Sequence, residues 1–165
     1  MIRDAQTGDL EAITTIYNQA IDARFQTCFT EPLKSEERLG WLQQHMADGY
    51  PVLVYELDNR VAGWLSISPY RQGRNALKYA VEISYFLHHD YQRKGIGTML
   101  LSHAISRCRD LGYKTLLAIL LDRNTASIRL LEKAGFERWG FLPGIAEFDG
   151  VACGQYYYGL LVNQV

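Results

Sequence analysis

Long apolar runs, cysteine pairs and an excess of one charge are all missing from this 165-residue sequence. No apolar run approaches the roughly 20 residues that a membrane-spanning helix needs, and residues 1–4 begin no apolar signal segment. The three cysteines, Cys28, Cys108 and Cys153, are widely spaced and include no C-x-x-C pair, which argues against a disulfide framework and a zinc site. We therefore expect a cytoplasmic protein with reduced cysteines and no membrane association.

The charge balance also limits the range of partners. The net charge is −1, from 17 basic and 18 acidic residues spread along the chain. Binding to nucleic acid requires a broad cationic face, so nucleic acid is not an expected partner. Apolar residues make up 48% and charged residues 21%, which is normal for a folded globular domain. With no internal repeat and no linker, the sequence predicts one domain over residues 1–165.

The hydrophobic pattern predicts a mixed α/β domain. Helices are expected after residues 7–9, after Ser35, over residues 95–111 and after Asn124. Strands are expected near Ile2 and over residues 52–57, 61–68, 78–87, 115–121, 139–148 and 151–162. Because short polar turns join the second strand to the third and the sixth to the seventh, we expect a largely antiparallel sheet. A strand-helix-strand unit in the second half is added to that sheet.

The segment from Tyr85 to Thr98 joins a predicted strand to a predicted helix through a turn with two glycines, Gly95 and Gly97. The first N–H groups of a helix are unpaired and lie at its positive end, so they can bind phosphate groups. Glycines would let a pyrophosphate approach the main chain closely, although two glycines can also simply end a loop. The dinucleotide fingerprint fails because Leu100 replaces its third glycine, and no Walker-type loop is present.

Two motifs in this region resemble the signatures of the GNAT superfamily of N-acetyltransferases. Residues 92–97, Q-R-K-G-I-G, resemble its pyrophosphate loop, and residues 124–136, N-T-A-S-I-R-L-L-E-K-A-G-F, resemble its second signature. The resemblance implies a single-domain GNAT fold in which two central strands splay apart and acetyl-CoA binds between them. It places cofactor contacts at Tyr85, Phe86, Leu87, Arg93, Lys94, Gly95, Ile96, Gly97, Thr98 and Asn124.

Shorter matches along the chain resemble the phosphinothricin acetyltransferase branch of that superfamily. They cover residues 30–32, 74–76, 81–84 and 154–157. This resemblance implies a homodimeric enzyme that uses acetyl-CoA to acetylate the amino group of a small, amino-acid-like molecule, such as phosphinothricin or methionine sulfoximine. It places Arg74 and Asn75 in the acceptor pocket. A peptide or protein N-terminal acetyltransferase and a non-catalytic acyl-CoA-binding module remain open alternatives.

The reaction needs a general base, because an amine is mostly protonated at neutral pH. The branch resemblance assigns this role to Glu82, whereas the residues alone favour a surface glutamate. The tyrosine that the family often uses as general acid is replaced by Leu131, so no acid is assigned. Aromatic side chains mostly fill cores, but Phe29 and Tyr85 are candidates for the acceptor pocket.

Two adjacent histidines, His88 and His89, precede the pyrophosphate-like loop. Histidine is a common metal ligand, but no third ligand at metal spacing is apparent in the sequence. We therefore expect a solvated loop and no metal ion.

Overall fold

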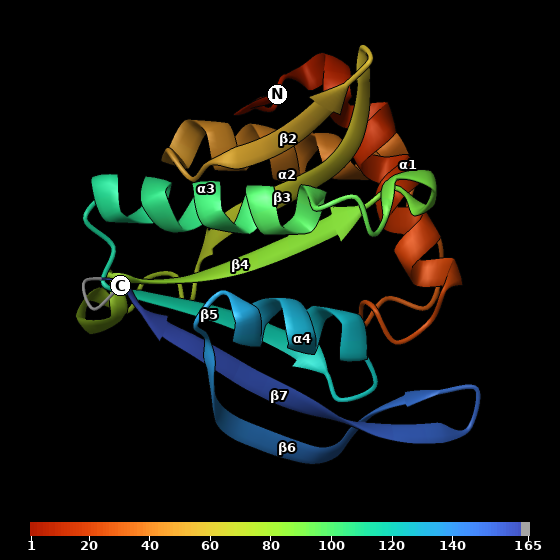
Figure 1. Cartoon of the computed structure of the whole chain (residues 1–165), viewed down its shortest axis with the longest axis vertical. Coiled ribbons are helices and arrows are strands. Elements are labelled where there is room, and N and C mark those ends of the chain that lie inside the picture. The colour runs from red at the N-terminus through yellow and green to blue at the C-terminus, as the bar shows by residue number, and fades with distance from the viewer. Residues whose placement is uncertain (163–165) are drawn as a thin grey trace.

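A seven-stranded sheet with helices on both faces forms the body of the computed structural model, which describes residues 1–162 (Figure 1). Residues 163–165 of the predicted domain lie outside the described residues. The strands are β1 (Ile2–Asp4), β2 (Val52–Leu57), β3 (Arg60–Pro69), β4 (Ala80–Leu87), β5 (Thr115–Leu121), β6 (Glu137–Phe148) and β7 (Val151–Leu161). Their order in the sheet is β1-β2-β3-β4-β5-β7-β6, and only the β4–β5 pair is parallel.

Four helices cover the two faces of this sheet. Helices α1 (Leu10–Asp22) and α2 (Ser35–Asp48) pack on one face, and α3 (Ile96–Asp110) and α4 (Thr125–Lys133) lie on the other (Figure 1). The described residues also include the short 3₁₀ turns η1 (Thr7–Asp9), η2 (Asn75–Leu77) and η3 (His89–Tyr91). No helix among the described residues is long and apolar enough to cross a membrane.

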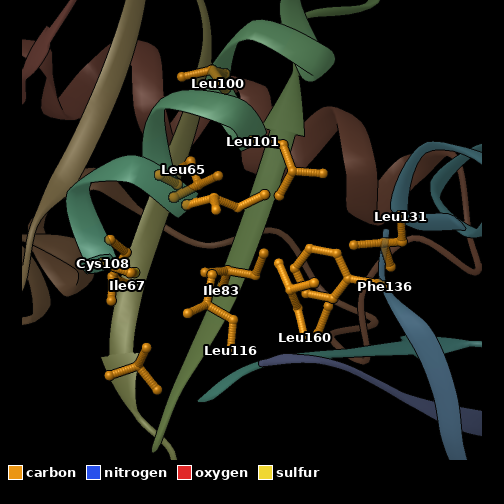
Figure 2. Close-up of a cluster of buried hydrophobic side chains, with 14 of the residues drawn as sticks. Leu65, Ile67, Ile83, Leu100, Leu101, Cys108, Leu116, Leu131, Phe136 and Leu160 are labelled. Carbon is orange, nitrogen blue, oxygen red and sulfur yellow. The ribbon is translucent and has the colours of Figure 1, made fainter. Parts of the chain in front are cut away.

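The two faces of the sheet bury different side chains because residues alternate along each strand. Leu65, Ile67 and Ile83 point toward α3 and join the larger core, in which Leu100, Leu101, Leu116, Leu131, Phe136 and Leu160 also lie (Figure 2). Trp64 lies on the opposite face, in the smaller core that α1 and α2 cover.

Strands β4 and β5 pair over only three residues and then separate. The ladder joins Ala80 to Thr115, Val81 to Leu116 and Glu82 to Leu117, while β4 continues to Leu87 and β5 to Leu121. Figure 1 shows the two strands diverging from this paired end. The edge of β4 that faces β5 is therefore unpaired in this ladder after Glu82. This confirms the predicted splayed strands.

Two strands begin two residues away from their predicted starts. Strand β4 begins at Ala80 rather than at residue 78, because η2 fills the preceding segment with a turn in which the Leu77 N–H donates to the Arg74 carbonyl. Strand β6 begins at Glu137, two residues before the predicted start, because pairing with β7 already holds this residue opposite Gly159.

Candidate active site

The first cavity, of about 290 Å³, lies beside the unpaired end of β4 and between the N-terminal ends of α3 and α4. Its lining residues are Gln26, Tyr85, Phe86, Leu87, Gln92, Arg93, Gly95, Ile96, Gly97, Thr98, Asn124, Ala126, Ser127 and Leu130. Every predicted cofactor residue except Lys94 is among them. The Lys94 ammonium group instead lies 5.0 Å from the centre of the Tyr91 ring. Sequence reasoning missed Gln26, which comes from the loop after α1.

The start of α3 forms one wall of the first cavity. Gly95 is the N-cap residue and has φ +80°, so the chain turns there in a conformation that favours glycine. The Met99 N–H donates to the Gly95 carbonyl at 3.1 Å. The N–H groups before Met99, in the first turn of α3, have no partner within the helix. These N–H groups lie at the positive end of the helix, and Arg93 adds a cation, so the wall suits phosphate groups.

Gly97 has a packing role in addition to its place in the first cavity. A Cβ atom built at this residue lies 3.0 Å from Leu130 Cδ2 and 3.4 Å from Leu87 Cδ1. A Cβ built at Gly95 meets no atom within 4 Å. A side chain at Gly97 would therefore press against leucines of α4 and β4 that also line the first cavity, and the close approach of a pyrophosphate to this residue stays a prediction.

The opposite wall is the start of α4, where two predicted residues also have structural contacts. The Asn124 side chain accepts a hydrogen bond from the Ser127 N–H at 3.3 Å and so caps the helix. The Tyr85 hydroxyl donates to the Ser127 carbonyl at 3.5 Å, and burial raises the pKa of Tyr85 to about 12. Tyr85 is therefore protonated at neutral pH. Among the cavities described, it lines the first and not the second, so its contact with an acceptor stays a prediction.

Leu131 occupies the position of the tyrosine expected in the family pattern. Its side chain is 1% exposed and belongs to the larger core (Figure 2). Its neighbour Leu130, by contrast, lines the first cavity. Position 131 therefore contributes no proton donor to this site.

The second cavity, of about 320 Å³, adjoins the first because Gln26 and Phe86 line both. Its floor is one face of the β3–β4 ladder, on which Trp64 pairs with Phe86, Ser66 with Ser84 and Ser68 with Glu82. The remaining lining residues are Tyr17, Thr27, Cys28, Phe29, Arg38, Trp41, Ile119, Leu120, Leu121 and Gln155. Phe29 lines this cavity, with its ring 5.8 Å from that of Tyr17, and its contact with an acceptor stays a prediction.

Glu82 is at the point where β4 and β5 separate, on the floor of the second cavity. Burial raises the pKa of this carboxyl group above the ordinary value for glutamate. A raised pKa makes the carboxylate a stronger base at neutral pH. The side chain lines a cavity and is only partly exposed, and its role as the general base stays a prediction.

Arg38 of α2 is the main residue of this cavity that sequence reasoning missed. Its guanidinium carbon lies 4.0 Å from the centre of the Trp41 ring and 4.7 Å from that of Tyr17. Nε and Nη2 are buried without a hydrogen-bond partner in the described chain, and no carboxylate of residues 1–162 pairs with them. Burial lowers the pKa of Arg38 from its usual value, but the group remains a cation.

Two predicted acceptor residues, Arg74 and Asn75, lie away from this cavity. Arg74 and Asn75 are exposed at the start of η2, and neither lines the first or the second cavity. Their contact with an acceptor stays a prediction.

A possible metal-binding cluster does include a third residue, which the sequence analysis overlooked. The ligand atoms of His88, His89 and Asp90 all lie within 4.8 Å of one another at the start of η3, for which His88 is the N-cap residue. His89 and Asp90 are exposed. The Asp90 N–H donates to His88 Nδ1 at 3.3 Å, so a turn within the chain already accounts for the arrangement.

The splayed strands, the start of α3 and the adjoining cavity define an acetyl-CoA-dependent N-acetyltransferase. The chain matches the Acetyltransferase (GNAT) family over residues 13–136 and belongs to that family. Acetyl-CoA fits the site, because an unpaired strand edge and unpaired helix N–H groups face the same cavity.

Particular relatives extend this similarity over most of the chain. A provisionally named phosphinothricin acetyltransferase of Bacillus subtilis (strain 168) is 39% identical over 150 residues, which are 90% of this chain and 91% of that protein. The L-methionine sulfoximine/L-methionine sulfone acetyltransferase of Salmonella typhimurium is 35% identical over 144 residues, or 87% and 84% of the two chains. A solved GNAT superfamily phosphinothricin acetyltransferase from Sinorhizobium meliloti, in complex with acetyl-CoA, has a TM-score of 0.92 at 28% identity and coverage of 98% and 87%.

Proposed function

We propose that this enzyme acetylates the amino group of a small molecule that also carries an acidic group, as amino acids do. The observation that carries this proposal is the second cavity, where a carboxylate with a raised pKa and a guanidinium without an anionic partner line one space. A base and a cation in one cavity suit an acceptor with an amine and an acid. The relatives named for phosphinothricin and methionine sulfoximine, both amino acids, support this class.

Glu82 is the proposed general base. The amine nitrogen attacks the thioester carbonyl of acetyl-CoA, the amide C–N bond forms as the C–S bond breaks, and coenzyme A leaves as a thiol with the proton that the attacking nitrogen loses. Glu82 takes the proton that the ammonium group must lose before its nitrogen can attack. The unpaired edge of β4 after Glu82 offers main-chain N–H groups that can stabilise negative charge on the carbonyl oxygen. Phe86, which lines both cavities, marks where the two reactants meet.

The acid group of the acceptor is proposed to contact Arg38, whose planar fork can bind a carboxylate through two hydrogen bonds. Arg74 and Asn75 are proposed to reach the acceptor only across a homodimer, because they line no cavity of their own chain. Exposed apolar side chains on β6, including Trp139, Phe141 and Ile145, support a second copy as the partner. The three free cysteines support a cytoplasmic location.

Release of free thiol from acetyl-CoA tests this proposal. The purified protein is incubated with a panel of amino acids, polyamines and short peptides, and each product is identified by mass spectrometry. We expect thiol release with an amino acid and an equal amount of its N-acetyl derivative. Preference for a polyamine or for a peptide N-terminus would contradict the proposed acceptor class. Binding of acetyl-CoA without turnover would show that the protein is a non-catalytic acyl-CoA-binding module.

A further inference from the structure

His45 and Ser68 form a hydrogen-bonded pair at the second cavity. His45 Nε2 lies 2.9 Å from Ser68 Oγ, and His45 Nδ1 lies 3.0 Å from the main-chain oxygen of Trp41. Ser68 lines the cavity and pairs directly with Glu82 in the β3–β4 ladder. Side chains directly opposite in such a ladder have Cβ atoms about 5 Å apart. The Ser68 hydroxyl and the Glu82 carboxylate therefore occupy neighbouring positions on the cavity floor.

The contact with Trp41 determines which way the Ser68 hydroxyl points. A main-chain carbonyl oxygen can only accept, so His45 Nδ1 must carry a proton and donate it. In the neutral imidazole, Nε2 is then an acceptor, and Ser68 must donate its single hydroxyl hydrogen to it. The lone pairs of Ser68 Oγ are left to accept hydrogen bonds from other donors.

We propose that Ser68 accepts a hydrogen bond from the acceptor's amino group beside Glu82, and that His45 is the positioning residue that keeps the Ser68 hydroxyl in its accepting orientation. This inference rests on the proposed function, because the amino group is the hydrogen-bond donor that the acceptor brings to Glu82. An ammonium group has three N–H donors, and Glu82 takes only one proton. A second acceptor on the cavity floor fixes the direction of the nitrogen lone pair toward the thioester.

Protonation of His45 reverses the arrangement. In the imidazolium form Nε2 is a donor, so Ser68 must accept from it, and the Ser68 hydrogen turns toward the amine. Burial lowers the pKa of His45, and Arg38 acts in the same direction, whereas the hydrogen bond to the Trp41 carbonyl and the charge of Asp48 oppose it. Glu82 faces the pair across Ser68. The neutral form is therefore present at pH 7, and the KM for the acceptor is expected to rise as the pH falls through this lowered pKa.

A double-mutant cycle tests the pair. Ser68→Ala removes the acceptor atom, and His45→Phe keeps a ring beside Trp41 but removes Nε2. We expect each single variant to raise the KM for the acceptor by roughly tenfold, because a hydrogen bond to a charged group is lost. The KM for acetyl-CoA should not change. In the Ser68→Ala background, His45→Phe should have no further effect on the acceptor KM. A separate Ser68→Thr variant, which retains a hydroxyl, should keep most of the wild-type affinity for the acceptor.

Ser102→Ala, an exposed serine of α3, is the matched control for loss of a hydroxyl. Thermal unfolding of all variants identifies any that do not fold. An unchanged acceptor KM in folded Ser68→Ala would overturn the assignment of Ser68. A full additional effect of His45→Phe in the Ser68→Ala background would overturn the role of His45. If the wild-type enzyme acetylates no amine at all, the proposed function fails first, and the place of the amine beside Ser68 fails with it.

Discussion

At the residue scale, Arg38 of the second cavity is a buried cation whose surroundings in its own chain only partly stabilise its charge. Arg38 is half-buried among aromatic rings, and Nε and Nη2 of its guanidinium find no acceptor in the described chain. A buried cation without an anionic partner lowers the free energy of unfolding. Its contacts with Tyr17 and Trp41 offset only part of that cost. A bound carboxylate would supply the missing partner.

Arg38→Met tests this interpretation, because methionine keeps an apolar stem over the rings and removes the charge. We expect the KM for an amino acid to rise roughly tenfold or more, which corresponds to at least about 1.4 kcal/mol of lost binding. The KM for the matching amine without a carboxylate should not change, and the free energy of unfolding should stay the same or rise. Steady-state kinetics with the two acceptors is the measurement. Equal effects on both acceptors would show that Arg38 does not bind the acid group.

At the scale of elements, the start of α3 is the part of the fold that we propose binds the phosphates of the cofactor. Gly95 begins this helix and Gly112 follows its end, with φ values of +80° and +79°, and a Cβ built at either residue meets no atom within 4 Å. Alanine at either position is therefore expected to cost a similar amount, about 1 kcal/mol, through backbone strain alone.

Gly95→Ala should weaken acetyl-CoA binding, whereas Gly112→Ala should not, because only Gly95 lines the first cavity. We expect a loss of affinity of about tenfold or more, since a shifted turn misaligns the N–H groups that face the phosphates. Calorimetric titration with acetyl-CoA measures this, and thermal unfolding checks that the two variants lose similar stability. Equal acetyl-CoA affinities in the two variants would contradict the phosphate-binding role of this turn.

The elements themselves were largely predictable, and the second cavity was not. Local sequence patterns predict the helices and strands, because hydrophobic periodicity and turn residues determine secondary structure over a few neighbouring positions. Ser66 and Ser68 alternate with the buried residues Leu65 and Ile67. From the sequence, this alternation predicts a strand with one polar face and nothing more. Arg38 of α2 covers this face because distant segments of the chain pack together. The sequence contains no local signal for that packing.

At the scale of the whole molecule, the position of Arg74 leads to a proposal about assembly. Arg74 is exposed and lines neither cavity of its own chain, yet the branch resemblance places it at the acceptor. Both statements are reconciled if Arg74 enters the pocket of a second copy. Sedimentation analysis should therefore find a dimer.

Hybrid dimers test whether Arg74 acts across the interface. Arg74→Ala and Glu82→Gln subunits with different affinity tags are combined, and the hybrid is isolated. One pocket of the hybrid then has an intact Glu82 and receives an intact Arg74 from the other subunit. We expect about half of the wild-type turnover at low acceptor concentration, well above the mean of the two parent dimers. A hybrid no more active than that mean would show that Arg74 acts within its own chain or not at all.

The central claim is that Glu82 removes a proton from the acceptor amine, and the ratio of wild-type to Glu82→Gln kcat/KM across pH tests it most directly. Burial raises the pKa of Glu82, so the carboxylate is lost as the pH falls through that raised value, and free amine accumulates without a base at high pH. We predict a ratio of roughly 10² to 10⁴ near neutral pH that declines on both sides, with unchanged affinity for acetyl-CoA. A ratio near one at neutral pH would contradict the account.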